Sequence, residues 1–352
     1  MTSRARNSAI HEKRNQQVLS DVVRTYIETG EPVSSRSISR LSAESLSPAT
    51  IRNVMADLED DGFLFQPHTS AGRVPTAAAY RFFVQQVSSS ATLSDDDRAL
   101  IRRELAEAHT PEEVMERASH VLAVISRGLG IIVTPPLSST VLEHIRFLTL
   151  PDGRLLVVLI SRGGVTRDKV VRLDRAFTQE ELDRTAEFLN RQYTGRTLAE
   201  IRADLSRQLA QDRERYDKLL GNAVVLCDPS VLGADTAPQV YVEGAAHIAS
   251  APEFAGQTQL GGLLAAIEEK KRLVALLSGC IEAPEPVQVR IGVDEFSGAG
   301  EHLALITAPY VLQEHVQGSL GVLGPMRMQY ERAITAVAYV ARMFGERREE
   351  KS

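Results

Sequence analysis

The segment SPATIRNVMADLEDDGFLFQPHTSAGRVPT, residues 47–76, begins with the pattern of a helix and ends with that of a tight hairpin. Ser47 is a suitable N-cap, and Pro48 takes the first helical position, where a backbone N–H is not required. Gly62 is a typical signal for the end of a helix. The apolar positions between them recur at helical spacing and form the predicted buried stripe: Ile51, Val54, Met55 and Leu58.

A short hairpin is predicted directly after this helix. Its strands are residues 62–65 and 73–75, and the tip is PHTSAG. The aromatic residues Phe63 and Phe65 are expected to anchor the hairpin in the core, whereas Arg73 offers a fork that suits a phosphate or a minor-groove edge. For the loop on its own, a plain surface turn built from Ser and Gly is the alternative.

Two further helices are predicted before residue 47. Apolar residues at a spacing of four indicate an amphipathic helix over residues 13–28. Ser34 is a plausible N-cap for a short helix over 35–40, with Ile38 and Leu41 expected to face inward. Three helices with a short second one, followed by a hairpin, form the layout of a winged helix-turn-helix, in which the third helix reads DNA.

This layout predicts which side chains meet DNA. Arg52 and Asn53 lie on the outward side of the third helix, and both can make bidentate contacts with base edges. The N-terminal end of that helix also attracts phosphate. The complete set of predicted DNA contacts is Ser35, Arg36, Ser47, Thr50, Arg52, Asn53, His68, Thr69, Ser70, Gly72 and Arg73.

Charge is unevenly distributed along the 352 residues. The whole chain has a net charge of −6, whereas the first 55 residues hold eight basic and five acidic residues, a net charge of +3. A local basic face on an acidic protein fits a small DNA-binding module attached to a larger body. A chance fluctuation of three charges is the alternative.

The remaining composition points to a cytoplasmic protein. The longest apolar runs, such as LLVVLI at residues 155–160, are too short to cross a bilayer. The N-terminal sequence lacks the apolar core of a secretory signal. Cys227 and Cys280 are far apart in the sequence, so no disulfide framework is expected.

The rest of the chain predicts an α+β body. The polar string over residues 88–97 is the expected linker, and Asp152-Gly153 indicates a hairpin turn. The predicted elements are helices over 97–108, 111–126 and 328–344, strands between 131 and 173 and again between 240 and 324, and a helical region over 178–226. One central sheet, built from strands on both sides of the helical region, is expected.

No motif for catalysis or metal binding was found. The eight histidines lack the spacing of a zinc site, and the chain has neither a GxxxxGK[ST] phosphate loop nor a GxSxG elbow. We therefore expect a binding protein without a cofactor or metal. The glycines of GSLGVLGPMRMQYERAI, residues 318–334, could form a loop before a helix that binds an anion, with Arg327 and Tyr330 nearby. The alternative is close packing, with Arg327 in a structural salt bridge.

Several segments resemble the bacterial family of heat-inducible transcription repressors HrcA. The segment SPATIRNVMADLEDDGFLFQPHTSAGRVPTAAAYRFFV, residues 47–84, is similar to the N-terminal signature of that family. VYVEGAAHI, APEF and GVLGPMRMQY, at residues 240–248, 251–254 and 321–330, resemble later blocks of the family in the same order. The resemblance extends over nearly the whole chain.

The resemblance implies a repressor of chaperone operons and not an enzyme. Such a repressor binds double-stranded DNA as a homodimer, at an inverted-repeat operator of the CIRCE type upstream of groE and dnaK genes. It releases the operator on heat stress and is kept active by the chaperonin GroEL. The implied domains are a winged helix-turn-helix over residues 1–87, a GAF-like domain over 88–177 and 238–352, and an inserted helical dimerisation segment over 178–237. A GAF-like domain that binds a small molecule controlling DNA binding is the alternative.

Overall fold

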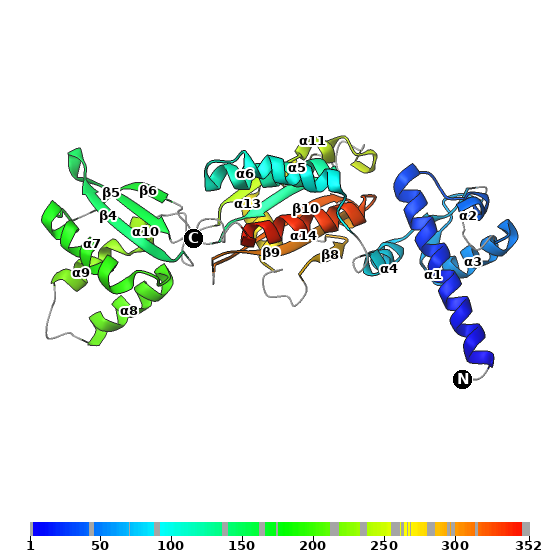
Figure 1. Cartoon of the computed structure of the whole chain (residues 1–352), viewed down its shortest axis with the longest axis horizontal. Helices are drawn as coiled ribbons and strands as arrows, with labels where there is room; N and C mark the ends of the chain where they lie inside the picture. The colour runs from blue at the N-terminus through cyan, green and yellow to red at the C-terminus, as the bar shows by residue number, and fades with distance from the viewer. Residues whose placement is uncertain are drawn as a thin grey trace. The chain divides into compact units, whose positions relative to one another are not determined.

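The chain is a mixed structure of helices and strands, which confirms the expected α+β class (Figure 1). The computed structural model describes residues 3–41, 46–69, 71–87, 92–135, 140–161, 166–173, 175–211, 218–232, 238–254, 269–279, 286–293, 300–313 and 316–346, together with residues 261, 264, 265, 267 and 296. The chain divides into two compact units, of which the first comprises residues 1–131, 242–308 and 320–340.

The first 87 residues form what we call the N-terminal module. Its elements are α1 (Ser3–Thr29), α2 (Ser35–Leu41), α3 (Pro48–Asp60), β1 (Leu64–Phe65), β2 (Val74–Pro75) and α4 (Ala77–Val87). Helix α1 begins ten residues earlier than expected and ends before Gly30, whose φ of +71° suits glycine. The two strands pair antiparallel, as predicted.

Two apolar positions of the module differ from expectation. Leu41 is 64% exposed, because it is the last residue of α2 and extends beyond the side that buries Ile38. In the hairpin, Leu64 rather than Phe65 is buried, and Phe65 is 46% exposed. Successive residues of a strand point to opposite faces, so only one of these two can enter the core. The expectation that both aromatic residues anchor the hairpin was therefore wrong for Phe65.

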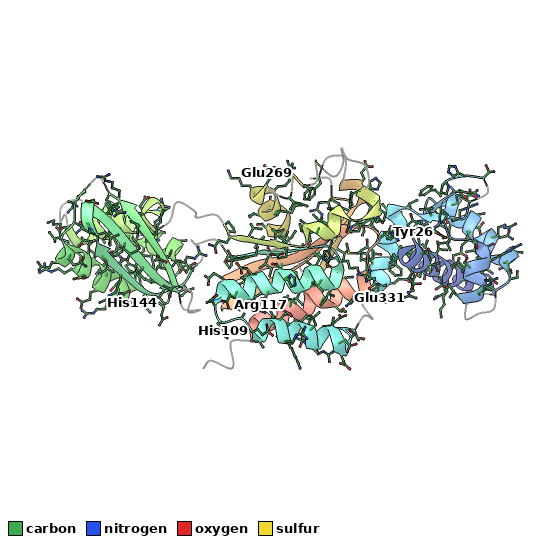
Figure 2. All side chains as sticks on the ribbon, turned by 90° about the horizontal axis from the view of Figure 1, so that it is seen from above. Tyr26, His109, Arg117, His144, Glu269 and Glu331 are labelled. Carbon is green, nitrogen blue, oxygen red and sulfur yellow. The ribbon has the colours of Figure 1, made fainter. Side chains whose placement is uncertain are left out.

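A five-stranded sheet with helices forms what we call the body. The strand order is β7-β3-β10-β9-β8. Its elements are α5 (Asp95–Ala106), α6 (Pro111–Ser126), β3 (Leu129–Val133), β7 (Val240–Glu243), α11 (Ala245–Ala249), α13 (Lys270–Ser278), β8 (Gln288–Ile291), β9 (Leu303–Gln313), β10 (Val316–Pro325) and α14 (Tyr330–Glu346), with short 3-10 turns η3 (Pro252–Phe254) and η4 (Gly300–His302). In Figure 2, α5, α6 and α14 lie on one side of this sheet and α13 on the other.

Some boundaries in the body differ from the predictions. Ser94 caps α5 by accepting a hydrogen bond from the N–H of Asp97, so the helix begins at Asp95 and shortens the expected linker. Residues 88–91 of that linker lie outside the described residues. The glycines over 318–324 lie within strand β10, which agrees with the strands predicted up to residue 324 and with the close-packing alternative, and not with an anion-binding loop. Glycine is needed there because a side chain would collide with neighbouring groups. A Cβ at Gly321, for example, would lie 2.4 Å from the carbonyl oxygen of Ile306.

A second sheet, of three strands, packs with helices, and together they form what we call the inserted subdomain. The strand order is β4-β5-β6, and both pairs are antiparallel. Its elements are β4 (Leu142–Thr149), β5 (Arg154–Ser161), β6 (Thr166–Arg172), α7 (Gln179–Tyr193), α8 (Leu198–Gln211), α9 (Lys218–Leu226) and α10 (Pro229–Leu232), with the 3-10 turn η2 (Pro151–Gly153) between β4 and β5. The predicted turn at Asp152-Gly153 is present, and both residues have positive φ.

This second sheet corrects the expectation of a single central sheet. Only β3 precedes the inserted subdomain and joins the later strands in one sheet. Strands β4–β6 pair with each other instead, because their inward residues, such as Phe147 and Val157, share a buried core with Leu182 and Leu189 of α7. The three strands and the helices that follow them thus share a separate hydrophobic core.

Candidate nucleic-acid interface

The start of α3 is held by its capping residue. The Oγ of Ser47 accepts a hydrogen bond from the N–H of Thr50 at 3.1 Å, and the two hydroxyl oxygens lie 2.9 Å apart. Ser39 of α2 donates a hydrogen bond to the carbonyl oxygen of Leu46 at 2.7 Å, which ties α2 to the residues just before α3. A fixed helix N-terminus with further N–H groups facing outward is favourable for an anion such as a phosphate.

Helix α3 separates a buried side from an exposed one. The predicted stripe of Ile51, Val54, Met55 and Leu58 is buried, which confirms it. Arg52 and Asn53 are exposed next to this stripe, and Thr50 is half-buried at the capped end. The structure therefore presents Arg52 and Asn53 to solvent within the first two turns of the helix.

The two predicted contacts on α2 lie in different environments. Arg36 is exposed, whereas Ser35 is buried. Ser34 caps this helix, as predicted, by accepting a hydrogen bond from the N–H of Ser37 at 3.1 Å. Arg36 is thus accessible to a ligand in the free protein, and Ser35 is not.

The tip of the hairpin is shaped by one glutamine. The amide nitrogen of Gln66 donates hydrogen bonds to the carbonyl oxygens of Thr69 and Ala71, at 3.0 and 2.8 Å. His68 and Thr69 are exposed at this tip, whereas Ser70 lies outside the described residues. The predicted contacts His68 and Thr69 therefore stand on a loop that is held in place from within.

The return strand of the hairpin is bound to the segment between α1 and α2. Arg73 and Val33 exchange backbone hydrogen bonds of 2.8 and 2.9 Å. A Cβ at Gly72 would lie 2.4 Å from the carbonyl oxygen of Val33, so only glycine permits this approach. Gly72 was predicted as a DNA contact in the hairpin tip, and its close packing on Val33 was not predicted.

Arg73 is paired within the module. Its NH2 atom lies 2.8 Å from Oε2 of Glu59, and Glu59 also accepts a hydrogen bond from the N–H of Gln66 at 3.1 Å. The acidic Glu59 at the end of α3 thus holds both strands of the hairpin. This pair holds the Arg73 side chain, which is 19% exposed, against the end of α3.

Arg327 and Tyr330, predicted as an effector site or as structural residues, both have partners within the protein. The Nε of Arg327 donates a hydrogen bond to Oε1 of Glu253 at 2.7 Å, and this bond raises the pKa of Arg327. The hydroxyl of the buried Tyr330 donates to the carbonyl oxygen of Met326 at 2.7 Å. These contacts agree with the structural alternative of the sequence analysis.

Similarity to known proteins covers nearly the whole chain. The repressor HrcA of Geobacter sulfurreducens is 37% identical over 332 residues, which are 94% of this chain and 96% of that protein. The HrcA protein of Syntrophobacter fumaroxidans is 34% identical over 339 residues, covering 96% and 97% of the two chains. Both relatives are named heat-inducible transcription repressors.

The fold is also found in a solved structure. A crystal structure of a hypothetical protein matches with a TM-score of 0.63 at 24% identity, over 96% of this chain and 99% of that one, which shows a shared fold. Within the described part of the chain, no helix has the length and apolar character needed to cross a membrane. The model of the family described as the HrcA protein C terminal domain matches residues 112–334. The chain therefore belongs to the HrcA family, a family of transcription repressors and not of enzymes.

Proposed function

We propose that this protein represses chaperone genes in the bacterial cytoplasm by binding an inverted-repeat DNA operator as a homodimer. The observation that carries the proposal is the presence of exposed Arg52 and Asn53 beside the capped start of α3, in a chain of the HrcA family. Side chains at this end of a recognition helix are those that reach base edges in the major groove.

The arrangement of elements in the N-terminal module supports its assignment as a winged helix-turn-helix. Helices α1–α3 bury one shared core, and the hairpin follows α3 directly. In this arrangement α3 enters the major groove, while the tip residues His68 and Thr69 and the exposed Arg36 contact the sugar–phosphate backbone. Arg73 and Gly72 set the position of the wing, and we place them in a supporting role.

DNA footprinting tests this proposal. The full-length protein is bound to DNA from upstream of the chaperonin genes of its own organism, with the Arg52→Ala and Asn53→Ala variants alongside. We expect protection of an inverted repeat that both variants weaken. Protection by the variants that equals that of the unchanged protein would exclude α3 as the reading helix.

The homodimer is supported by the outer face of the sheet β4-β5-β6. One face of this sheet is covered by helices, whereas Leu148 and Val170 on the other are 40% and 46% exposed. Leu156, Val158 and Ile160 of the central strand lie on the same outer face and are half-buried. An apolar stripe on both faces of a strand is typical of strands covered on both sides. We therefore extend the dimerisation segment from residues 178–237 to include this sheet.

Charge complementarity favours a second copy of the chain as the partner of this face. Val158 pairs with Arg146 on one side and with Asp168 on the other, so the three form one row across the sheet. A two-fold axis parallel to β5 would place Arg146 of each copy opposite Asp168 of the other. The same operation would place Leu148 opposite Val170, and Val158 opposite itself. These two rows of the face are thus complementary to themselves, as an isologous interface requires.

The family resemblance also suggests how the repressor is regulated. We propose that the body is a GAF-like domain, that heat stress releases the protein from DNA, and that the chaperonin GroEL favours the DNA-binding form. Gel-shift titration at increasing temperature, with and without added chaperonin, tests this part. Loss of DNA binding only at the temperature of global unfolding would argue against a dedicated heat response.

A further inference from the structure

Buried aromatic rings join the N-terminal module to the body within one compact unit of the chain. The rings of Tyr80 and Phe83 on α4 lie 6.1 and 6.5 Å from the ring of Tyr330, the first residue of α14. All three side chains are almost fully buried. Arg81 of the same helix donates a hydrogen bond to the carbonyl oxygen of Ile291 at 3.2 Å. Helix α4 is therefore fixed to the body along more than one side.

Helix α1 makes a second contact with the body. The NH2 atom of Arg24 lies 2.8 Å from Oε1 of Glu331, and the two side chains are 50% and 51% exposed. Figure 2 labels Glu331 on α14. Ion pairs this exposed add little to the free energy of unfolding, so this pair can be changed without unfolding the protein. The position of the Arg24–Glu331 pair matters more, because the pair connects α14 of the body to α1 of the module.

Arg327 makes a third contact, at the end of α1. A Cβ at Gly30 would lie 2.4 Å from NH1 of Arg327, so the guanidinium packs directly on the backbone where α1 ends. The φ of Gly30, +71°, is also in the region that favours glycine. Glu253 holds Arg327 from the other side through the 2.7 Å hydrogen bond. Glycine at residue 30 thus serves both the turn after α1 and the close approach of the body.

We propose that Arg24, Gly30, Arg327 and Glu331, which we call the module–body contact, position the reading helix so that the dimer accepts one spacing between operator half-sites. If α4 were its only attachment to the body, the module could rotate about that helix. The contacts at α1 add two more, and together they oppose rotation of the module about α4. Because a dimer engages two half-sites at once, modules that cannot rotate on their bodies can reach fewer spacings than modules that can. The inference rests on the proposed function.

The test measures the spacing preference. The probes are duplexes with the inverted repeat from upstream of the organism's chaperonin genes, in which the spacer is lengthened or shortened by up to about five base pairs, half a helical turn. For the unchanged protein we expect one preferred spacer. For Glu331→Arg, which sets two positive charges against each other, we expect the ratio of affinities between the preferred and the altered spacers to fall about tenfold or more. Affinity for a duplex with a single half-site should stay the same.

Matched variants separate positioning from general damage. The double variant Arg24→Glu/Glu331→Arg restores an opposite-charge pair and should restore the spacing preference. Glu269→Arg breaks the exposed Arg272–Glu269 pair of 3.3 Å at the start of α13, outside both the module–body contact and the dimerisation segment, and should leave the preference unchanged. A spacing preference of Glu331→Arg equal to that of the unchanged protein overturns the inference, as does a double variant that stays as tolerant as the single one. Failure of the unchanged protein to bind any of these duplexes would instead overturn the proposed function.

Discussion

Arg332 holds Asp97 through two hydrogen bonds, from Nε to Oδ2 at 2.7 Å and from NH2 to Oδ1 at 2.5 Å. Asp97 lies in the first turn of α5 and Arg332 in that of α14, so the pair joins the first and last helices of the body. These hydrogen bonds hold the pKa of the buried Asp97 carboxyl below its ordinary value of 3.8. A second bond between the same helices, from Nε of Arg102 to the hydroxyl of Tyr339 at 2.7 Å, lies further along them.

The first prediction is that Arg332→Leu lowers the free energy of unfolding by about 1.5–3 kcal/mol at neutral pH, because a buried carboxylate loses its charged hydrogen bonds. A folded-state pKa below the unfolded one stabilises the protein above pH 3.8, and this stabilisation is lost as the pH falls through the folded-state pKa. The difference between the two proteins in urea unfolding should therefore shrink below pH 3.8. Arg98→Ala, which removes an exposed pair with Asp95, is the control and should change little. Equal stability of Arg332→Leu and Arg98→Ala would contradict the assignment.

The second prediction concerns reading by α3. Replacing Arg52 or Asn53 by Ala should cost about 1–3 kcal/mol of discrimination between the operator and unrelated DNA, because each side chain can make paired hydrogen bonds to a base edge. Gel-shift titrations against both DNAs measure this difference. Asp57→Asn changes an exposed residue further along the same helix and should keep the discrimination. An equal loss of affinity for both DNAs would assign Arg52 or Asn53 to phosphate instead.

The N-terminal module was largely predictable because its signals are local. Ser47 and Pro48 set the start of α3, and Ser34 caps α2 as predicted, since capping depends on neighbouring residues. The partners of the site residues could not be predicted in the same way. The contacts of Arg73 with Glu59 and of Gly72 with Val33 join residues that are distant in sequence, and composition carries no signal for such pairs.

The body shows a different limit. Strands β4–β6 were predicted as strands, but the sequence did not predict that they pair with each other in a separate sheet. The apolar pattern of a strand indicates that it is buried and does not indicate which sheet it joins. For the glycines around residue 321 the sequence left two interpretations open, a loop before a helix and the close packing of a strand. In the structure Gly321 lies in a strand that passes very close to Ile306, and such close packing has the same sequence pattern as a turn.

The third prediction concerns the support of the wing. Gly72→Ala places a Cβ only 2.4 Å from the carbonyl oxygen of Val33, and the other atoms near it are also backbone. Such overpacking typically costs about 1–3 kcal/mol, so we expect a lower melting temperature and weaker DNA binding. Gly62→Ala is the matched control, because Gly62 has positive φ but open space around it. Its effect should be limited to backbone strain of about 1 kcal/mol. If Gly62→Ala weakened DNA binding as much as Gly72→Ala does, the approach to Val33 would not explain the effect.

The fourth prediction concerns the outer face of the sheet β4-β5-β6. Val158→Asp introduces a carboxylate on the proposed two-fold axis, where each copy would meet the same charge of the other, so the protein should become a monomer. Light scattering coupled to size-exclusion chromatography measures the mass. Asp168→Arg should also weaken the dimer, because the new arginine of each copy would lie opposite Arg146 of the other copy. The double variant Arg146→Asp/Asp168→Arg restores opposite charges across the axis and should restore the dimer. A dimer that persists in Val158→Asp would show that the copies meet through another surface, since no isologous interface centred on this residue could bury two carboxylates.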